Sequence, residues 1–266
     1  MIPVFFAAAG GLFPALAGCL NIALEGLLLI GAFSSFTVFY FTGNVAAAII
    51  AAITAAAAVS MLHAFAAFRL RADLFISGLA VNLFSSGLCI ILSEKIFKTK
   101  GVVSVSMMNI NKMPSLFNLY IILGIILLFL AWLSLYKMPF GYRLRACDKN
   151  ADALISLGIK PQIYQISAIL ISGFFCGIGG SFLALNLGAY VPGMSAGKGW
   201  IALAVIFLGL RKPLGILAAA VVFALAESSS NYLQGFLQIP VDFILAIPYI
   251  CTLLAIIVVS VINKSK

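Results

Sequence analysis

Long, uninterrupted apolar runs constrain the fold of this chain more than any other feature of its sequence. The hydrocarbon core of a bilayer is about 30 Å thick, and a helix needs roughly 20 apolar residues to cross it. Residues 22–41, 45–68 and 116–136 reach that length. Lipid offers no partners to backbone groups, so only helices and closed barrels cross it, and barrel strands alternate polar and apolar residues. The continuous runs therefore predict an all-α integral membrane protein.

Nine apolar segments can be recognised, which predicts a polytopic helical bundle of about 8–9 transmembrane segments in one domain, residues 1–266. The segments are residues 3–20, 22–41, 45–68, 74–92, 116–136, 163–183, 200–210, 214–226 and 241–262. The seventh has about half the length of a crossing. It follows AYVPGMSAGKGW, whose glycines and proline prevent a straight helix. We therefore expect broken or re-entrant helices near this point.

Two glycine patterns predict how neighbouring segments are arranged. Thr42-Gly43-Asn44 separates the second and third segments, and Gly and Asn tolerate the backbone angles that a reversal requires. Gly173 and Gly177 have the GxxxG spacing, which lets two helix backbones approach closely. The first pattern predicts a helical hairpin and the second predicts a helix-packing contact.

The composition agrees with a membrane protein and excludes other classes. Hydrophobic residues make up 64% of the chain and charged residues 9%, with a mean hydropathy of +1.21, whereas about a quarter of a soluble domain is charged. Sixteen Lys and Arg against seven acidic residues give a net charge of +9. In a bilayer protein this excess fixes topology, so we expect lipid contact and no nucleic acid. The five cysteines lack metal-site spacing, and no metal site is expected.

The distribution of basic residues predicts the orientation. If residues 141–162 are cytoplasmic, eleven Lys and Arg lie inside and five outside. The eleven are Arg69, Arg71, Lys137, Arg143, Arg145, Lys149, Lys160, Arg211, Lys212, Lys264 and Lys266. The positive-inside rule favours this arrangement, which also makes the C-terminus cytoplasmic and leaves the N-terminus outside.

One charged stretch, GYRLRACDKNADALISLGIKPQIY at residues 141–164, interrupts the apolar sequence. Asn150 is suited to cap a helix, and Asp152 places negative charge in the first turn. Gly158 is suited to end the helix, and Pro161 prevents its continuation. The stretch therefore predicts a two-turn helix outside the membrane.

The predicted helix has an apolar face formed by Ala153, Leu154 and Leu157. A helix of two turns is not stable alone in water. Its apolar face must rest on the bilayer surface, as a simple connector would, or on a partner protein.

A few polar side chains lie within the apolar segments. Glu25 is the most informative, because a charge at the bilayer centre costs about 2.5–3.5 kcal/mol on insertion scales and needs a cavity or a partner. Asn21 lies one turn earlier, and Asn82 and Ser77 lie together in the fourth segment. These groups could bind a polar substrate along a pathway through the bundle, or they could bond to neighbouring helices. The sequence leaves both interpretations open.

Several stretches together resemble one transporter family. They are GLFPALAGCLNIALEGLLLIGAF, RLRADLFISGLAVNL, GYRLRACDKNADALISLGI, and GMSAGKGWIALAVIFLG with the following Pro213-Leu214-Gly215. Nearly the whole chain is similar to the nucleoside and simple-sugar permeases of the branched-chain-amino-acid-type permease superfamily, which are subunits of ATP-binding-cassette (ABC) importers. Within it, Asp152, Ala153 and Gly158 match the E-A-A-x-x-x-G coupling motif of such subunits.

The resemblance implies a transport subunit that performs no bond chemistry. The charged segment at residues 141–162 would be a cytoplasmic coupling helix that docks on an ATPase subunit. The residues implied in coupling are Arg143, Arg145, Asn150, Asp152, Ala153, Leu154, Leu157 and Gly158. The chain contains no GxxxxGK[ST] sequence, so ATP and Mg²⁺ would be bound by that partner and no cofactor by this chain. A second permease subunit and an extracytoplasmic substrate-binding lipoprotein would complete the importer in a bacterial inner membrane.

The chain departs from the family pattern at several positions. Its first segment is shorter at the N-terminal end, Phe13-Pro14-Ala15-Leu16 replaces a charged turn, and Asp152 and Leu154 replace Glu and Ala of the motif. The resulting hypothesis is a permease for nucleosides. The alternatives are a permease for simple sugars or branched-chain amino acids, and a secondary transporter, which would show more intramembrane acids or paired broken helices.

Overall fold

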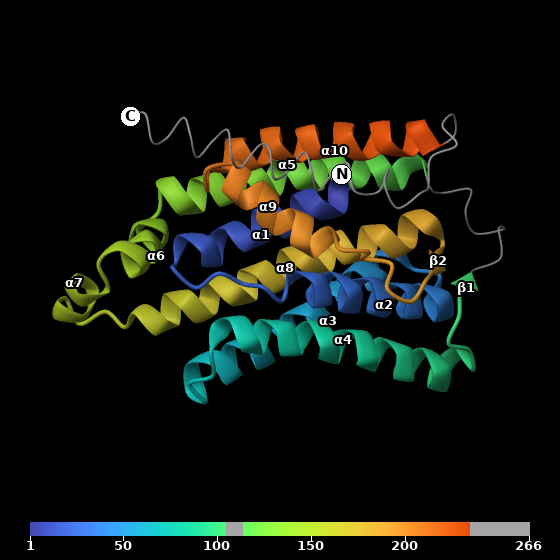
Figure 1. Ribbon diagram of the computed structural model, residues 1–266, viewed down its shortest axis with the longest axis horizontal. Coiled ribbons are helices and arrows are strands. Elements are labelled where there is room, and N and C mark those ends of the chain that lie inside the picture. The colour runs from blue at the N-terminus through green and yellow to red at the C-terminus, as the bar shows by residue number, and fades with distance from the viewer. Residues whose placement is uncertain (105–113, 235–266) are drawn as a thin grey trace.

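The computed structural model describes residues 1–104 and 114–234, and these residues form a bundle of helices (Figure 1). Five helices are long and apolar enough to cross a membrane, namely Leu24–Thr42, Val45–Arg69, Leu74–Phe97, Leu116–Tyr136 and Pro161–Leu187. Shorter apolar helices cover Ile2–Leu16, Lys198–Leu208 and Pro213–Ser229. The predicted polytopic helical membrane protein is thereby confirmed, whereas the predicted ninth segment, residues 241–262, lies outside the described residues.

The elements follow one another with short connections. Their order is α1 (Ile2–Leu16), α2 (Leu24–Thr42), α3 (Val45–Ala64), the π-helical turn η1 (Phe65–Arg69), α4 (Leu74–Phe97), β1 (Val103–Ser104), α5 (Pro114–Tyr136), α6 (Pro139–Lys149), α7 (Ala151–Ser156), α8 (Pro161–Leu187), β2 (Ala189–Tyr190), α9 (Lys198–Leu208) and α10 (Pro213–Gln234). The two short strands pair antiparallel, Val103 with Tyr190 and Ser104 with Ala189.

Helix α8 lies at the centre of the bundle, between α1, α2 and α3 (Figure 1). Of its 18-residue apolar window 72% is buried, against 22% for α5 at the periphery. Glycines make this central position possible: a Cβ on Gly177 would lie 2.7 Å from the Ala52 carbonyl oxygen, and one on Gly173 would lie 3.0 Å from that of Ala56. The GxxxG prediction is confirmed as a close contact with α3.

The predicted hairpin between α2 and α3 is also confirmed. Gly43 ends α2 with φ +64°, a left-handed conformation that glycine adopts without strain. Asn44 caps α3, and its Oδ1 accepts hydrogen bonds from the amides of Ala46 (2.9 Å) and Ala47 (3.3 Å).

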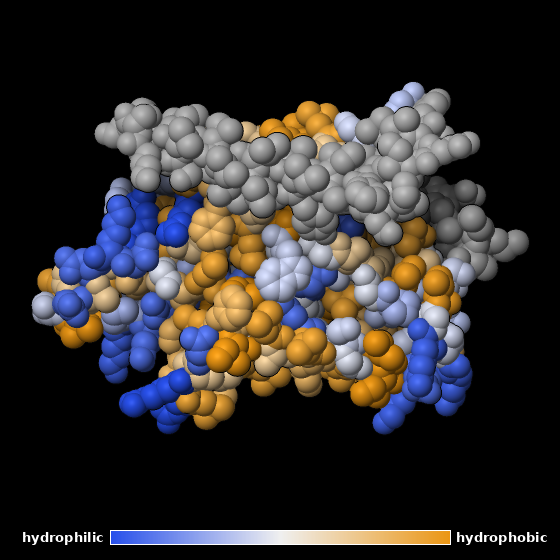
Figure 2. All heavy atoms as spheres, viewed as in Figure 1, coloured by the Kyte–Doolittle hydropathy of each residue, from blue (hydrophilic) through white to orange (hydrophobic). Residues whose placement is uncertain are grey.

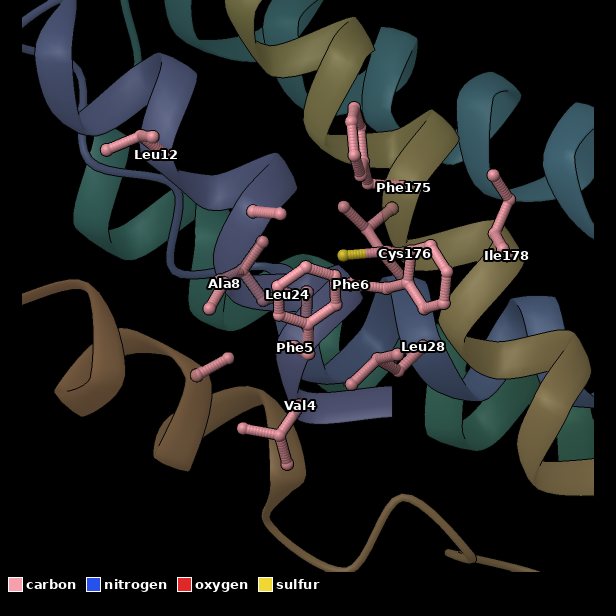
Figure 3. Packing of buried hydrophobic residues seen from close by; sticks show 14 of the residues in the cluster. Val4, Phe5, Phe6, Ala8, Leu12, Leu24, Leu28, Phe175, Cys176 and Ile178 are labelled. Carbon is pink, nitrogen blue, oxygen red and sulfur yellow. The ribbon is translucent and has the colours of Figure 1, made fainter. Parts of the chain in front are cut away.

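The side chains are arranged as a bilayer requires. Phe6, Leu24 and Cys176 pack together where α1, α2 and α8 meet (Figure 3). Outward-facing residues such as Leu83 and Ile125 are apolar and exposed, and Figure 2 shows apolar side chains over the flank and hydrophilic ones mainly at the two ends. The mean hydropathy of the chain is thus explained by apolar residues both inside the bundle and on its lipid-facing surface.

The end of the molecule opposite the β-strands carries α6 and α7 (Figure 1). Helix α7, over Ala151–Ser156, confirms the predicted short helix. Helix α6 was not predicted, although Pro139 occupies its first turn, where proline is favoured. The charged stretch is therefore two short helices that meet at Asn150.

Candidate functional site

Between α1 and α2 the chain runs unwound through the interior of the bundle. Residues 17–23 form turns and extended backbone, yet Ala17, Cys19, Asn21 and Ala23 are fully buried. Irregular backbone at membrane depth is tolerated only where its polar groups find partners within the protein. Polar side chains from other helices must therefore reach this stretch, which we call the unwound stretch.

Three side chains supply those partners. Gln165 Nε2 donates to the Ala17 carbonyl (3.2 Å), and Asn82 Nδ2 donates to the Ile22 carbonyl (3.0 Å). Asn82 Oδ1 also accepts from the amide of Gly26 at 2.8 Å. Asn21 Oδ1 accepts from the Ala23 amide at 3.0 Å. The unwound stretch is thus held to α4 and α8 by side-chain amides.

Asn21 also makes a direct contact between helices. Its Nδ2 donates to Ser172 Oγ on α8 at 2.6 Å, and Ser172 Oγ donates in turn to the Ile169 carbonyl at 2.7 Å. Both polar atoms of this buried amide are therefore engaged with the protein.

Glu25, in the first turn of α2, bonds to the start of α9. Its Oε1 accepts from the amide of Gly197 (2.9 Å) and its Oε2 from the amide of Gly199 (2.7 Å). The first amides of a helix lack partners within it and carry partial positive charge, so a carboxylate is favoured there. The expected partner of the intramembrane acid is therefore the backbone of a helix that begins inside the bundle.

Ser77 is placed apart from the other three predicted pathway residues. Its hydroxyl lies 2.9 Å from Nδ1 of His63 on α3, and His63 is fully buried. The structure thus brings Asn21, Glu25 and Asn82 to the unwound stretch, and joins Ser77 to His63 instead.

Sequence reasoning missed several groups at this site. Gln165 and Ser172 were not selected, although an isolated polar residue in an apolar run signalled both. The backbone amides of Gly197 and Gly199 could not be selected from the sequence, because nearly every residue carries such an amide. Ser85 Oγ lies buried beside Gly26 with no hydrogen-bond partner among the described residues.

The second candidate site is α7. Asn150 Oδ1 accepts from the amide of Ala153 at 3.3 Å, which confirms the predicted cap. Gly158 has φ +73°, and the amide of Ile159 donates to the Leu154 carbonyl at 2.9 Å, which ends the helix. Asp152 lies in the first turn, as expected.

The apolar residues of α7 do not share one environment. Leu154 is buried against the protein, but Ala153 is exposed, and Leu157 is 75% exposed and Ile155 60% exposed. The predicted single apolar face is therefore wrong, because Leu154 packs against the rest of the chain whereas Leu157 is exposed. Two large apolar side chains project from this end of the molecule.

Helix α6 holds the two arginines that were predicted beside α7. Arg143 Nη1 donates to the Tyr164 hydroxyl at 2.9 Å. The Arg145 guanidinium lies 4.8 Å from the ring centroid of Tyr136 and 5.1 Å from that of Tyr142, an arrangement that cation–π attraction favours. On the same helix, burial raises the pKa of the Cys147 thiol, whose sulfur lies 3.7 Å from the carbonyl oxygen of Pro161 at the start of α8.

Comparison with known proteins places the chain in a family. Residues 1–259 match the family described as branched-chain amino acid transport system, permease component. The chain belongs to this family. It is the permease component of an ABC transporter, a non-catalytic transport subunit that works with ATPase and substrate-binding proteins, and a multi-pass membrane protein.

Individual relatives are similar over most of their length. The chain is 34% identical to the guanosine ABC transporter permease protein NupQ of Bacillus subtilis and 32% identical to the nucleoside ABC transporter permease protein NupC of Lactococcus lactis, in both cases over 96% of this chain and 87% of the relative. It is 27% identical, over 85% of the chain and 72% of the relative, to a putative glucose ABC transporter permease protein, TsgC13, of Haloferax volcanii. No solved structure matched the chain at comparable significance.

Proposed function

We propose that this chain forms the translocation pathway of an ATP-driven importer of nucleosides. The observation that carries the substrate class is the similarity to guanosine and nucleoside permeases over 96% of the chain. Imported nucleosides are neutral and polar, so they require hydrogen-bonding groups and no strong field along their path. The intramembrane polar side chains of this protein are mainly amides and hydroxyls.

Helix α7 is the coupling helix and lies in the cytoplasm, with the C-terminus on the same side. The exposed side chains of Ile155 and Leu157 support this role, since a partner's cleft can bury them and gain free energy. The coupling surface comprises Arg143, Arg145, Asn150, Asp152, Ala153, Leu154, Leu157 and Gly158. The ATPase that docks there binds ATP and Mg²⁺.

The substrate path runs beside the unwound stretch and along α4, and its candidate residues are Asn21, Glu25, Asn82 and, on α4 beside His63, Ser77. Helix α9, with eleven residues, is too short to cross a bilayer, which supports a bundle with broken or re-entrant helices, about 8–9 segments in a single domain over residues 1–266. In the described state these four side chains bond to the protein. Substrate would replace some of those bonds as the path opens.

The complete importer contains a second permease subunit, identical or homologous, ATPase subunits and an extracytoplasmic binding lipoprotein in a bacterial inner membrane. The lipoprotein delivers substrate at the end that carries β1 and β2, opposite α7 (Figure 1). Alternating access follows when ATPase closure moves α7.

The test is uptake by the reconstituted importer in proteoliposomes. ATP-dependent uptake of labelled guanosine should be inhibited by unlabelled nucleosides and not by free ribose or glucose. The similarity to the putative glucose permease makes sugars the second candidate, and stronger inhibition by sugars would select it. Uptake that follows an ion gradient without ATP would contradict the importer class.

A further inference from the structure

Helix α9 packs on α1 and α2, the two helices that the unwound stretch connects. At the N-terminal end of α9, the Glu25 carboxylate accepts the amides of Gly197 and Gly199. At the other end, Arg211 Nη1 lies 3.4 Å from the carbonyl oxygen of Ala15, just before the unwound stretch begins. The eleven residues of α9 extend about 16 Å at 1.5 Å per residue. The contacts at its two ends therefore link α2 to α1, on either side of the unwound stretch.

The same arginine contacts the coupling region. Arg211 Nη1 lies 3.5 Å from Asp148 Oδ2 on α6. Asp148 precedes the α7 cap residue Asn150 by two positions, and it packs on Gly18, where a Cβ would lie 2.9 Å from Asp148 Oδ1. Gly18 has φ +73°, so the unwound stretch can pass this close to α6. Asp148 thus contacts both the unwound stretch and Arg211, which lies three residues after the end of α9.

The turn that carries Arg211 is strained. Leu210 and Arg211 have φ angles of +54° and +53°, and two successive residues with a Cβ rarely adopt this left-handed conformation. The turn is closed by hydrogen bonds from the amides of Arg211 to Ile206 (3.1 Å) and Lys212 to Gly209 (3.0 Å). Such strain persists where the surroundings require it, and here it accompanies the contact of Arg211 with α6 and α1.

We propose that α9 transmits motion from the coupling helix to the unwound stretch, and that Arg211 and Asp148 are positioning residues of transport. This inference rests on the proposed importer function. Displacement of α7 moves Asp148, Asp148 moves Arg211 and the end of α9, and Glu25 carries the shift to the start of α2. The side chains of Arg211 and Asp148 are 43% and 39% exposed, so solvent screens their attraction and the ion pair is weak. A weak ion pair can form and break in each transport cycle.

The test measures uptake and ATP hydrolysis in the same proteoliposomes of the complete importer. Arg211→Gln and Asp148→Asn should each lower the uptake per ATP hydrolysed by about fivefold or more, a ratio typical of coupling between sites, while ATP hydrolysis continues. The charge exchange, Asp148→Arg with Arg211→Asp, should restore part of that ratio. The control is Lys212→Gln, which removes an exposed positive charge from the same turn and should leave the ratio unchanged.

Three results would overturn the proposal. The first is an uptake per ATP hydrolysed that is unchanged in both single variants, and the second is a loss of this ratio in Lys212→Gln as large as in Arg211→Gln. The third is a loss of protein from the membrane in Arg211→Gln, Asp148→Asn and the charge exchange alike, which would show that the pair serves stability. Failure of the nucleoside assignment is a separate outcome, because it appears as absent guanosine uptake by the wild-type protein. The ratio is then measured with the solute that the importer accepts.

Discussion

The carboxylate of Glu25 and the amide of Gly199 are separated by 174 residues in sequence and joined by a 2.7 Å hydrogen bond. This contact, with that to Gly197, places an acidic side chain on the first turn of α9 inside the bundle. From the sequence alone, Glu25 is only a charge that is costly in lipid. The structure gives its carboxylate two backbone amides as partners, and the effect of replacing Glu25 follows from the loss of these hydrogen bonds.

Glu25→Ala should impair both the assembly of α9 and transport. The substitution leaves two part-buried amides without acceptors, and each unsatisfied group costs about 1–3 kcal/mol. Glu25→Gln keeps one acceptor and should lose less. Thermal unfolding of the purified protein and nucleoside uptake measure the two effects. Uptake by Glu25→Ala equal to that of the wild type would contradict the proposal that Glu25 lies on the substrate path.

Gly158→Val should abolish transport while the protein still inserts. A Cβ at Gly158 meets nothing within 4 Å, so the harm comes from the φ of +73°, which costs about 1–2 kcal/mol for a residue with a Cβ and more for a β-branched one. Gly158→Asn is the matched control, because Asn tolerates this conformation. Uptake assays paired with membrane levels distinguish the outcomes, and normal uptake by the valine variant would contradict the coupling assignment.

Gly177→Ala should destabilise the protein, and Gly87→Ala should not. An added Cβ at Gly177 would overlap the α3 backbone at 2.7 Å, and forced overpacking costs about 1–3 kcal/mol. Gly87 lies in α4, and a Cβ there meets nothing within 4 Å, so alanine should stabilise the helix by about 0.5–1 kcal/mol. Detergent-solubilised protein heated in parallel provides the comparison. A loss at Gly87 equal to that at Gly177 would contradict the close α8–α3 contact.

A thiol at position 157 should react from the cytoplasmic side, and Cys147 should not compete. Leu157 is largely exposed, whereas Cys147 is buried and its pKa is raised. Because the thiolate is the reactive form, labelling of Cys147 is slow at neutral pH and increases as the pH rises toward its pKa. An impermeant maleimide applied to inverted vesicles should label Leu157→Cys. Faster labelling of Leu157→Cys in right-side-out vesicles than in inverted vesicles would contradict the proposed orientation.

The parts of the fold that depend on local sequence could be predicted. The length of the apolar runs predicted the spanning helices, and Gly43 with Asn44 predicted the hairpin. Asn150 predicted the start of α7. Each of these signals lies within a few residues of the structure that it predicts. Helix α6 was missed because its charged sequence lacks a capping side chain, since Met138 occupies the cap position.

The contacts of the intramembrane site could not be predicted in the same way. Asn21 and Ser172 are 151 residues apart, and Gly26 and Asn82 are 56 apart, so nothing local connects them. Glu25 was identified as needing a partner, but that partner is a backbone amide, which every residue except proline carries. Sequence can therefore select the polar residues of a membrane interior without determining which of their neighbours they bind.

The exposed tip of α7 also bears on how the importer is assembled. Ile155 and Leu157 are exposed, and the ATPase docking proposed above would cover them; so small a helix has little intrinsic stability. A permease made in excess of its ATPase consequently displays an apolar, easily opened segment, which is the kind of site that proteases cleave and chaperones bind. The tip proposed to couple the permease to its ATPase would then also limit the number of stable permeases in the cell to the number of ATPases available to cover them.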